Sequence, residues 1–396
     1  MKQMKWVIVV VSIACLIGCI RSHASAIEAG SGRVHTYYVA ADEVDWNFTP
    51  SGMDKMMGMD FMGYAKVVTE HGPHRIGTVY RKAIYREYTD GSFTNLKPRP
   101  AGAEYLGMLG PILRGEVGET IRVVFKNNAT HPFSMHPHGV FYKKDSEGAA
   151  YADGTSAADK ADDGVPPGQT HTYTWDIPER AGPGPQDPSS LVWLYHSHTM
   201  DLKDVESGLI GAMIVTRRGS SDASGKPRDV DREFVNLFMI FDENVSWYLD
   251  HNIQTFTGDP KGVKKLEFIP GNEEGVFSVL NTGFGPSNIK ATINGYMYAN
   301  MPVMTMKQGE RVRWYLITVG QGFNFHTPHW HGNVVMQAGA LMSFRLRRRK
   351  WRLWTWFRTI PACGCITAIL RNTCTQAWWV CTKSSHKRNA ISRRDE

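Results

Sequence analysis

The chain contains the same short unit twice: a turn and a strand, followed by a pair of histidines. Residues 115–125 precede His-Pro-His-Gly at positions 136–139, and residues 306–316 precede His-Trp-His-Gly at positions 329–332. The turn glutamate stands 19 residues before the second histidine in the first copy and 21 residues before it in the second. A repeat with nearly constant spacing predicts two copies of one folding unit.

From Val34 onward the chain has the pattern of short strands. Segments rich in β-branched and aromatic residues alternate with Gly, Pro and Asn/Asp turns, at residues 78–85, 120–125, 170–175, 209–215 and 233–241. This pattern is typical of a β-sandwich or barrel. Residues 217–231 are rich in Ser, Gly, Asp and Lys and predict a linker. With 396 residues, we expect a first domain at 34–217, a linker at 218–231 and a second domain at 232–340.

Seven of the fifteen histidines gather in three clusters: His136 and His138, His196 and His198, and His326, His329 and His331. Residues i and i+2 of a strand point to the same face roughly 6.6 Å apart, close enough to bind one metal ion or two adjacent ones. Imidazole is a good ligand for copper, zinc, iron and nickel. Three such pairs in one chain therefore predict a metal centre.

The order of these motifs resembles the first three copper motifs of the multicopper oxidases, whose domains are cupredoxin β-sandwiches. The more specific resemblance is to ceruloplasmin and the A domains of the coagulation factors, and its further landmarks are residues 109–111, 208–211, 242–248 and 293–296. It covers about residues 35 to 340. It implies an all-β chain with two cupredoxin-like Greek-key β-sandwich domains.

The resemblance also implies a set of copper ligands. Type 2 copper would take His136 and His329, the type 3 pair would take His138, His196, His198 and His331, and type 1 copper would take His326. In this family the type 1 copper accepts single electrons from a reductant, and the three-copper cluster collects four to reduce dioxygen to water. Ser197 stands where a thiolate would bind, so we expect no type 1 site in the first domain.

Residues 341–396 differ in composition from the rest of the chain. They carry thirteen Lys or Arg against two acidic residues, a net charge of +11, which leaves −4 on the remainder. No basic stripe with interleaved aromatic residues remains, so nucleic acid is not expected as a partner. This aberrant basic tail also lacks the His-Cys-His-x-x-x-His-x-x-x-x-Met motif with which the family completes its type 1 site. We expect it to form no strand and to leave the second domain incomplete.

A frameshift explains the tail. Reading the last base of each codon with the first two of the next, residues 355–369 can be encoded by bases that also read Asp-Met-Val-Pro-Asp-Asn-Pro-Gly-Val-Trp-Leu-Tyr-His-Cys-His. Residues 370–383 then permit Phe-Glu-Glu-His-Met-His-Ala-Gly-Met and the sequence that follows. The shifted frame admits the whole missing motif. A natural basic tail, or a zinc site of its four cysteines, is the alternative.

The N-terminus has the pattern of a secretory signal. Lys2 and Lys5 precede an apolar run at residues 6–20, and Ala-Ser-Ala follows at 24–26, so we expect a signal peptide at 1–26 and a secreted or periplasmic protein. Residues 16–19 also resemble a bacterial lipoprotein cleavage box, which leaves membrane anchoring through Cys19 open. Residues 27–362 contain no cysteine, so the folded part cannot depend on disulfides.

An acidic loop follows the first histidine pair, with Glu147, Asp153, Asp162 and Asp163. Oxygen ligands of this kind suit calcium. Their spacing resembles the calcium loop of the coagulation-factor A domains. A calcium site and a solvated turn both stay open on the sequence.

Two functions of different class follow. The first is an exported copper oxidase that couples one-electron oxidation of a phenol or metal ion to reduction of dioxygen to water, with its type 1 site lost in this chain. The second is a catalytically inactive scaffold that binds copper and calcium. A nitrite-reductase-like enzyme would require a cysteine in the first domain, which is absent. By analogy with two-domain oxidases, we expect a homotrimer with each copper cluster between neighbouring subunits.

Overall fold

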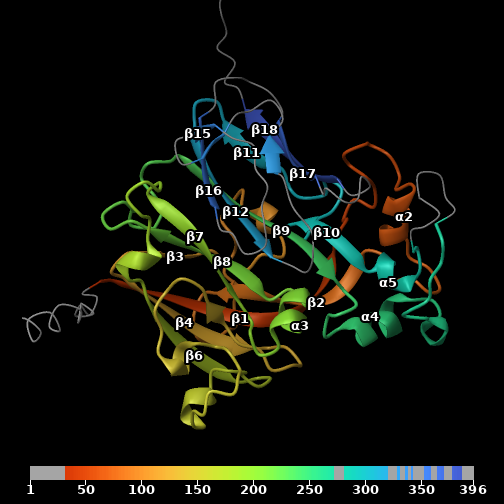
Figure 1. The fold of residues 1–396 in the computed structure, drawn as a ribbon, viewed down its shortest axis with the longest axis horizontal. Coiled ribbons are helices and arrows are strands. Elements are labelled where there is room, and N and C mark those ends of the chain that lie inside the picture. Colours follow the sequence, from red (N-terminus) through yellow and green to blue (C-terminus); the bar gives the residue numbers. More distant parts are fainter. Residues whose placement is uncertain are drawn as a thin grey trace, which may run out of the picture.

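A computed structural model describes residues 32–271, 281–319, 328–330, 335–337, 340–341, 352–357, 364–369 and 377–385. The predicted signal segment and Cys19 lie outside these residues. Strands dominate the described chain, and its helices are short (Figure 1). The prediction of an all-β fold is confirmed. Each of the five predicted strand segments coincides with an observed strand.

Two four-stranded sheets are built from the first half of the chain. One has the order β2-β1-β4-β6, from β1 (Val34–Asn47), β2 (Val79–Tyr88), β4 (Thr120–Asn127) and β6 (Thr170–Asp176). The other has the order β3-β8-β7-β5, from β3 (Leu113–Glu116), β5 (His136–Pro137), β7 (Ser190–His196) and β8 (Ile210–Thr216). Their facing side chains, such as Leu113, Ile121 and Trp175, form one buried cluster.

The second half repeats this strand order. One sheet is β10-β9-β12-β16-β14-β15, from β9 (Arg232–Asp242), β10 (Ile289–Ile293), β12 (Arg311–Val319), β14 (Met336–Gln337), β15 (Ala340–Leu341) and β16 (Arg352–Phe357). The other is β11-β18-β17-β13, from β11 (Met304–Lys307), β13 (Pro328–Trp330), β17 (Gly364–Ile369) and β18 (Ala377–Ser385). The parallel pairing of β1 with β4 recurs between β9 and β12. The chain therefore has two cupredoxin-like Greek-key sandwiches, and the repeat in sequence is a repeat in topology.

The repeated turn has the same construction in both halves. Gly118 has φ 91° and Gly309 has φ 86°, a left-handed conformation in which glycine avoids the steric cost of a Cβ atom. The next residue, Glu119 or Glu310, accepts a hydrogen bond on its carboxylate from the backbone N–H three residues earlier, at 2.8 Å in each copy. The Gly-Glu pair therefore fixes the turn that leads into β4 and β12.

The expectation that the tail forms no strand was wrong. β16, β17 and β18 all lie within residues 341–396, and β16 pairs with β12 so that the backbone of Trp354 lies opposite that of Trp314. A strand ladder uses backbone N–H and C=O groups, which every residue except proline supplies in full. The tail's one proline, Pro361, falls in sequence between β16 and β17. The predicted domain boundaries themselves stay predictions.

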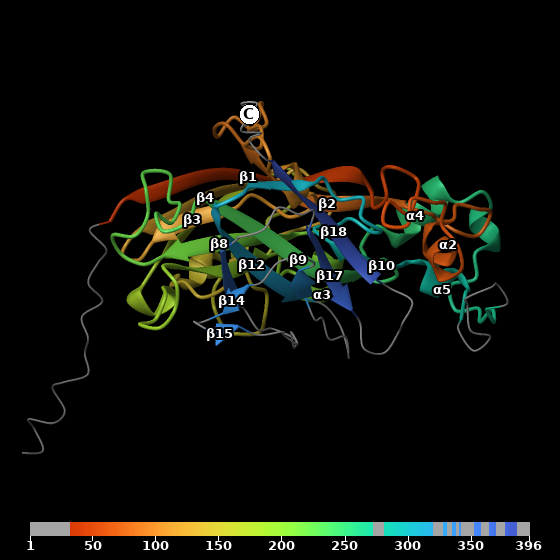
Figure 2. The same cartoon turned by 90° about the horizontal axis from the view of Figure 1, so that it is seen from above.

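The helices are confined to connections. They are α2 (Tyr64–Thr69), α3 (Asp201–Glu206), α4 (Leu249–Phe256), α5 (Phe284–Ser287), and the 3₁₀ turns η1 (Glu104–Leu106), η2 (Lys144–Ser146), η3 (Ala158–Lys160), η4 (Glu179–Ala181) and η5 (Pro260–Gly262). α2, α4 and α5 gather at one end of the molecule in both views (Figures 1 and 2). Within the described chain, none of the helices has the length and apolar character needed to cross a bilayer.

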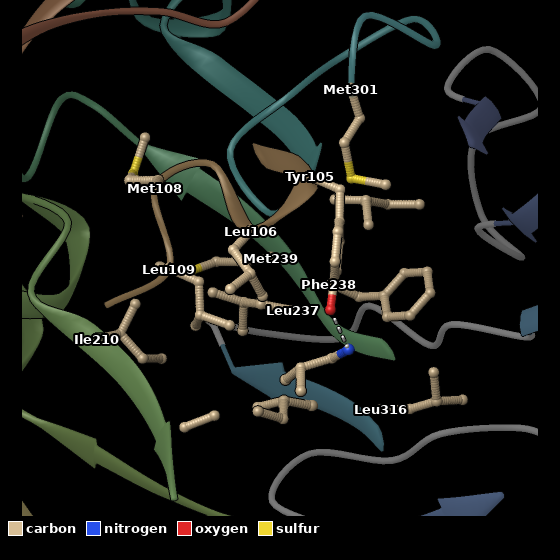
Figure 3. Close-up of a cluster of buried hydrophobic side chains, with 14 of the residues drawn as sticks. Tyr105, Leu106, Met108, Leu109, Ile210, Leu237, Phe238, Met239, Met301 and Leu316 are labelled. Carbon is tan, nitrogen blue, oxygen red and sulfur yellow. Dashed lines mark hydrogen bonds between the residues drawn. The ribbon is translucent and has the colours of Figure 1, made fainter. Parts of the chain in front are cut away.

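The two halves share a continuous apolar core. Met108, Leu109 and Ile210 of the first half pack with Leu237 and Leu316 of the second (Figure 3). Each such buried side chain contributes roughly 1.5–3 kcal/mol to folding. The halves are thus held together by the same apolar burial that stabilises each sandwich.

A polar cluster also crosses the junction. Arg114 on β3 pairs with Glu233 on β9 at 2.9 Å, and the Tyr315 hydroxyl donates to the same carboxylate at 2.6 Å. The Ser190 hydroxyl on β7 lies 2.7 Å from that of Tyr315. Because these contacts are directional, they fix the register between the halves as well as their proximity.

Candidate metal centre

Four of the predicted copper ligands come together at one end of the β5–β7 pair. The two strands are antiparallel, and His136 lies directly opposite His196. Because the strands are antiparallel, His138 and His198, each two residues further along its own segment, lie on opposite sides of this pair. The His138 N–H donates to the Leu194 carbonyl, and the His198 N–H donates to the Ser134 hydroxyl. The Nε2 atoms of His138 and His196 are 3.0 Å apart.

The other ring separations are similar. The centroid of the His136 ring lies 5.1 Å from that of His138, 5.7 Å from that of His196 and 5.1 Å from that of His198. The rings of His196 and His198 are 5.4 Å apart. The structure therefore brings together all four histidines that the sequence predicts in the first domain.

Backbone carbonyls orient two of these rings. His136 Nδ1 lies 2.6 Å from the carbonyl oxygen of Glu147, and His196 Nδ1 lies 2.9 Å from that of Ser197. Since a carbonyl only accepts, each Nδ1 donates, and in the neutral ring the lone pair is then on Nε2. Burial lowers the pKa of His136, which favours that neutral, metal-binding form. This donor set fits copper.

The glycine that follows the first histidine pair has a packing role. Gly139 has φ 82°, and a Cβ atom there would lie 2.3 Å from the indole ring of Trp193. Trp193 lies on β7, and its Nε1–H donates to the Ala181 carbonyl at 2.8 Å. The glycine of His-x-His-Gly therefore allows β7, with its histidines, to pack closely against β5.

Ser197 is buried between the two ligands of its motif, as a structural residue. Its hydroxyl donates to the Asp204 carboxylate at 2.7 Å and accepts from the Ser134 backbone N–H at 3.0 Å. Asp204 also accepts from the Met200 backbone N–H at 2.9 Å and from Trp247 Nε1–H at 2.8 Å. The sequence analysis missed Asp204, because no motif marks a carboxylate that acts through tertiary contacts.

The predicted ligands of the second half are only partly described. His329 is the central residue of β13, where its backbone pairs with that of Thr367 on β17. His326 and His331 lie outside the described residues. Among the residues that are described, no three His, Cys, Asp or Glu side chains converge on one point that could hold a metal ion.

The acidic loop is organised around a lysine. Lys144 Nζ lies 2.8 Å from Asp163, 3.3 Å from Glu147 and 3.4 Å from Asp153. Three of the four predicted calcium ligands therefore surround the ammonium group of Lys144. Asp162 differs, because its Oδ2 accepts from the Gly148 backbone N–H at 2.6 Å while its buried Oδ1 has no hydrogen-bond partner.

Comparison with known proteins identifies the family. A multicopper oxidase domain profile matches residues 105–220. The mouse (Mus musculus) ferroxidase HEPHL1 is 44% identical over 307 residues, rat (Rattus norvegicus) hephaestin 40% over 312, and sheep (Ovis aries) ceruloplasmin 40% over 309. This chain belongs to the multicopper oxidases. The matches cover 77%, 78% and 77% of this chain but 25%, 26% and 28% of the relatives, so the chain spans about a quarter of their length.

Solved structures agree on the fold. A crystal structure of a multicopper oxidase aligns with a TM-score of 0.50 and 17% identity, covering 89% of each chain. Copper nitrite reductase from Nitrosomonas europaea aligns with a TM-score of 0.52 and 15% identity, covering 90% of this chain and 95% of the reductase. At these identities the likeness concerns the cupredoxin architecture alone.

One signal for the second half was present in the sequence and went unused. Residues 192–196 read Val-Trp-Leu-Tyr-His, and the shifted frame permits the same five residues at positions 363–367. β7 and β17 hold equivalent places in the two sandwiches. The frameshift hypothesis would therefore extend the repeat into the tail.

Proposed function

We propose that this protein is of the exported copper oxidase type, which couples one-electron oxidation of a metal ion or a phenol to the reduction of dioxygen to water, and that its type 1 site is lost in the chain as written. The observation that carries the proposal is that the imidazole rings of His136, His138, His196 and His198 are neighbours on the β5–β7 pair. Copper bound there would supply the redox chemistry. The protein's part is to present neutral imidazoles in fixed orientations.

The contact between His138 and His196 supports a shared copper ion. Two imidazoles whose ring nitrogens lie side by side could hold one copper ion between them. Their Nε2 atoms are 3.0 Å apart. With at most two ligands per ion from this domain, the remaining ligands would come from the second-domain motifs, here His329, His331 and the motif missing from the tail.

Strand register supports the frameshift. His136 on β5 faces His196 on β7, and His329 on β13 faces Thr367 on β17. The shifted frame reads His-Cys-His at positions 367–369, which puts a histidine opposite His329. A frame chosen to restore a motif thus also restores the pairing seen in the first sandwich.

The reductant is proposed from the relatives. One of the most similar relatives is named a ferroxidase, which favours ferrous ion over a phenol.

Export rests on the signal pattern at 1–26, with Cys19 as an alternative lipid anchor. The homotrimer rests on the need for each first domain to meet a second domain, and light scattering on the copper-loaded protein tests it. Calcium at the acidic loop would have to displace the ammonium group of Lys144.

The chain as written favours the second candidate, an inactive copper- and calcium-binding scaffold, because it lacks the cysteine of a type 1 site. Resequencing the gene across the codons for residues 339–383 decides between the two. If resequencing confirms the reading frame of the present sequence, the inactive scaffold is the candidate that remains.

The frame-restored protein carries the shifted reading from position 355 onward and tests the oxidase directly. It should bind copper and consume dioxygen with ferrous ion. His138→Ala combined with His196→Ala should lower bound copper, measured by elemental analysis, and slow oxygen consumption about 100-fold. His74→Ala, an exposed histidine paired with Asp259, is the control and should change neither. Unchanged copper content in the double variant would overturn the site.

A further inference from the structure

A cavity of about 870 Å³ lies between the two halves and the segment that joins them. Its walls come from the end of β2, residues 96–103, the joining residues 224–230 and the start of β9. None of the predicted copper or calcium ligands that the structure describes lines it. Ligand sites in proteins typically enclose about 300–1,000 Å³ and are mostly apolar.

The walls are largely apolar. They include Ile84, Leu96, Ile112, Val230 and Phe234, together with four prolines. Such walls gain free energy when they cover the apolar body of a ligand, at roughly 25 cal/mol per Å² of apolar surface removed from water.

Several charges at the cavity are already neutralised by partners. Lys97 pairs with Glu87 at 2.7 Å, and Arg114 pairs with Glu233 at 2.9 Å. Arg232 pairs with Glu310 at 2.7 Å. These three cations therefore already have carboxylate partners within the protein.

Arg99 is different. Its Nη2 donates to the Leu109 carbonyl at 2.7 Å, and among the described residues no carboxylate pairs with it. A guanidinium group carries five N–H donors, so most of those of Arg99 remain available. Arg99 is an exposed residue, so a ligand can reach its guanidinium, and partial burial of that group lowers its pKa. Lys226 adds a second cation on the joining segment.

Tyr105 supplies a neutral donor. Its hydroxyl accepts a hydrogen bond from the Val235 backbone N–H at 3.2 Å (Figure 3). The hydroxyl proton itself has no acceptor among the described residues. Because Tyr105 also lines the cavity, a ligand oxygen could accept from it.

We propose that this cavity binds a small organic anion, with one carboxylate held by Arg99 and an apolar body against Ile112 and Phe234. The planar guanidinium fork matches the geometry of a carboxylate. Inorganic phosphate would remain strongly hydrated and would leave the apolar walls uncovered. The site is separate from the copper histidines, so it stands whether or not the chain is an oxidase.

Calorimetric titration of the copper-free, full-length chain with octanoate tests the proposal. Octanoate should bind saturably and raise the melting temperature, since it binds the folded state. Arg99→Gln should weaken octanoate binding about tenfold or more. Arg99→Lys keeps the positive charge but loses the planar guanidinium. Its affinity for octanoate should lie between those of the unchanged chain and Arg99→Gln. Arg122→Gln removes a comparable exposed charge on β4, outside the cavity, and should bind octanoate like the unchanged chain.

Two further probes separate the contributions of charge and apolar body. 1-Octanol, which has the same chain without the carboxylate, should bind more weakly than octanoate, and inorganic phosphate should not bind. Equal binding of octanoate to the Arg99→Gln variant, equal binding of octanol, or saturable binding of phosphate alone would each overturn the proposal.

Discussion

Lys290 shows how the fold places a charge where water cannot reach. It lies on β10 with no exposed surface, and its ammonium group donates to the carbonyl oxygens of Val68, Gly77 and Ser287. Burial lowers the pKa of Lys290 to about 7, although the nearby Glu243 carboxylate raises it in part. Three carbonyls solvate the ammonium group well enough to keep it buried, but not well enough to keep its ordinary pKa.

Lys290→Met should change how stability depends on pH. Between the folded pKa of about 7 and the ordinary value of 10.5, the unfolded chain holds a proton that the folded chain has lost. Stability therefore rises with pH in this window, by up to about 1.4 kcal/mol per pH unit from this one group. Urea unfolding at pH 8 and pH 10 should show a smaller rise for Lys290→Met than for the unchanged chain. The exposed Lys261→Met is the control, and an equal rise in both variants would contradict the assignment.

Lys144 is also a lysine whose environment shifts its pKa, but at a site that water can reach. Burial alone would lower the pKa of Lys144, but the hydrogen bond to Asp163 and the other carboxylates raise it. The ammonium group thus does for the acidic loop what a calcium ion would do: it neutralises converging carboxylates.

Lys144→Gln should destabilise the protein by about 1–3 kcal/mol, between the effects for exposed and for buried charge pairs. Calcium should then raise the melting temperature of Lys144→Gln more than that of the unchanged chain, because the ammonium group no longer competes. Lys143→Gln removes an exposed neighbouring charge and serves as the matched control. Melting curves that calcium and its chelation leave unchanged in all three proteins would exclude calcium from this loop.

At the scale of elements, Asp204 ties three segments together. It lies on α3, and its buried carboxylate accepts hydrogen bonds from Ser197 after β7, from Met200 before α3 and from Trp247 after β9. The segment that carries His196 and His198 is therefore held by a group belonging to the connection that follows it.

Asp204→Asn should lower the free energy of unfolding by about 2–4 kcal/mol. The NH2 group of the asparagine would face a buried hydrogen-bond donor that the carboxylate now accepts from. Urea unfolding of the copper-free chain measures this directly. Asp250→Asn removes a carboxylate that pairs with Lys265 on the exposed surface of α4, and should cost less than about 1 kcal/mol. Similar losses in the two variants would mean that Asp204 does not hold this segment.

At the scale of the whole molecule, the tail completes the sheets without completing the copper sites. β16, β17 and β18 take the places that β6, β7 and β8 hold in the first sandwich. Backbone pairing thus accommodates the tail, but residues 367–369 are Thr-Ala-Ile and supply neither thiolate nor imidazole. The strands can form without the metal ligands because sheets depend on backbone groups, whereas metal sites depend on side chains.

The 396-residue chain, loaded with copper, should therefore lack the intense absorption near about 600 nm that a Cys-ligated type 1 copper gives, and should not oxidise ferrous ion. The frame-restored protein should show both the band and the activity. Absorption spectra of the two proteins at equal copper content make the comparison. An intense blue band from the unaltered chain would contradict both the frameshift and the ligand set.

Much of the fold was predictable from local pattern. The five strand segments, the Gly-Glu turns and the repeated unit depend on neighbouring residues, and they appear where the sequence placed them. The meeting of His136 with His196 was also within reach, because both lie in motifs whose order resembles a known family. The strands of the tail were not predicted, because their side chains show no alternation and pairing is decided by partner strands already in place.

The sequence by itself determined the repeat, the strand-rich fold and the identity of the histidines that meet at β5 and β7. Tertiary structure decided the contacts between residues far apart in the chain: Lys144 among its carboxylates, Asp204 against Trp247, and Arg99 beside the cavity with no acidic partner among the described residues. The physical reason is that strands and turns follow from the conformational preferences of neighbouring residues. A buried charge instead depends on which polar atoms packing brings within hydrogen-bond distance, and no local pattern encodes them.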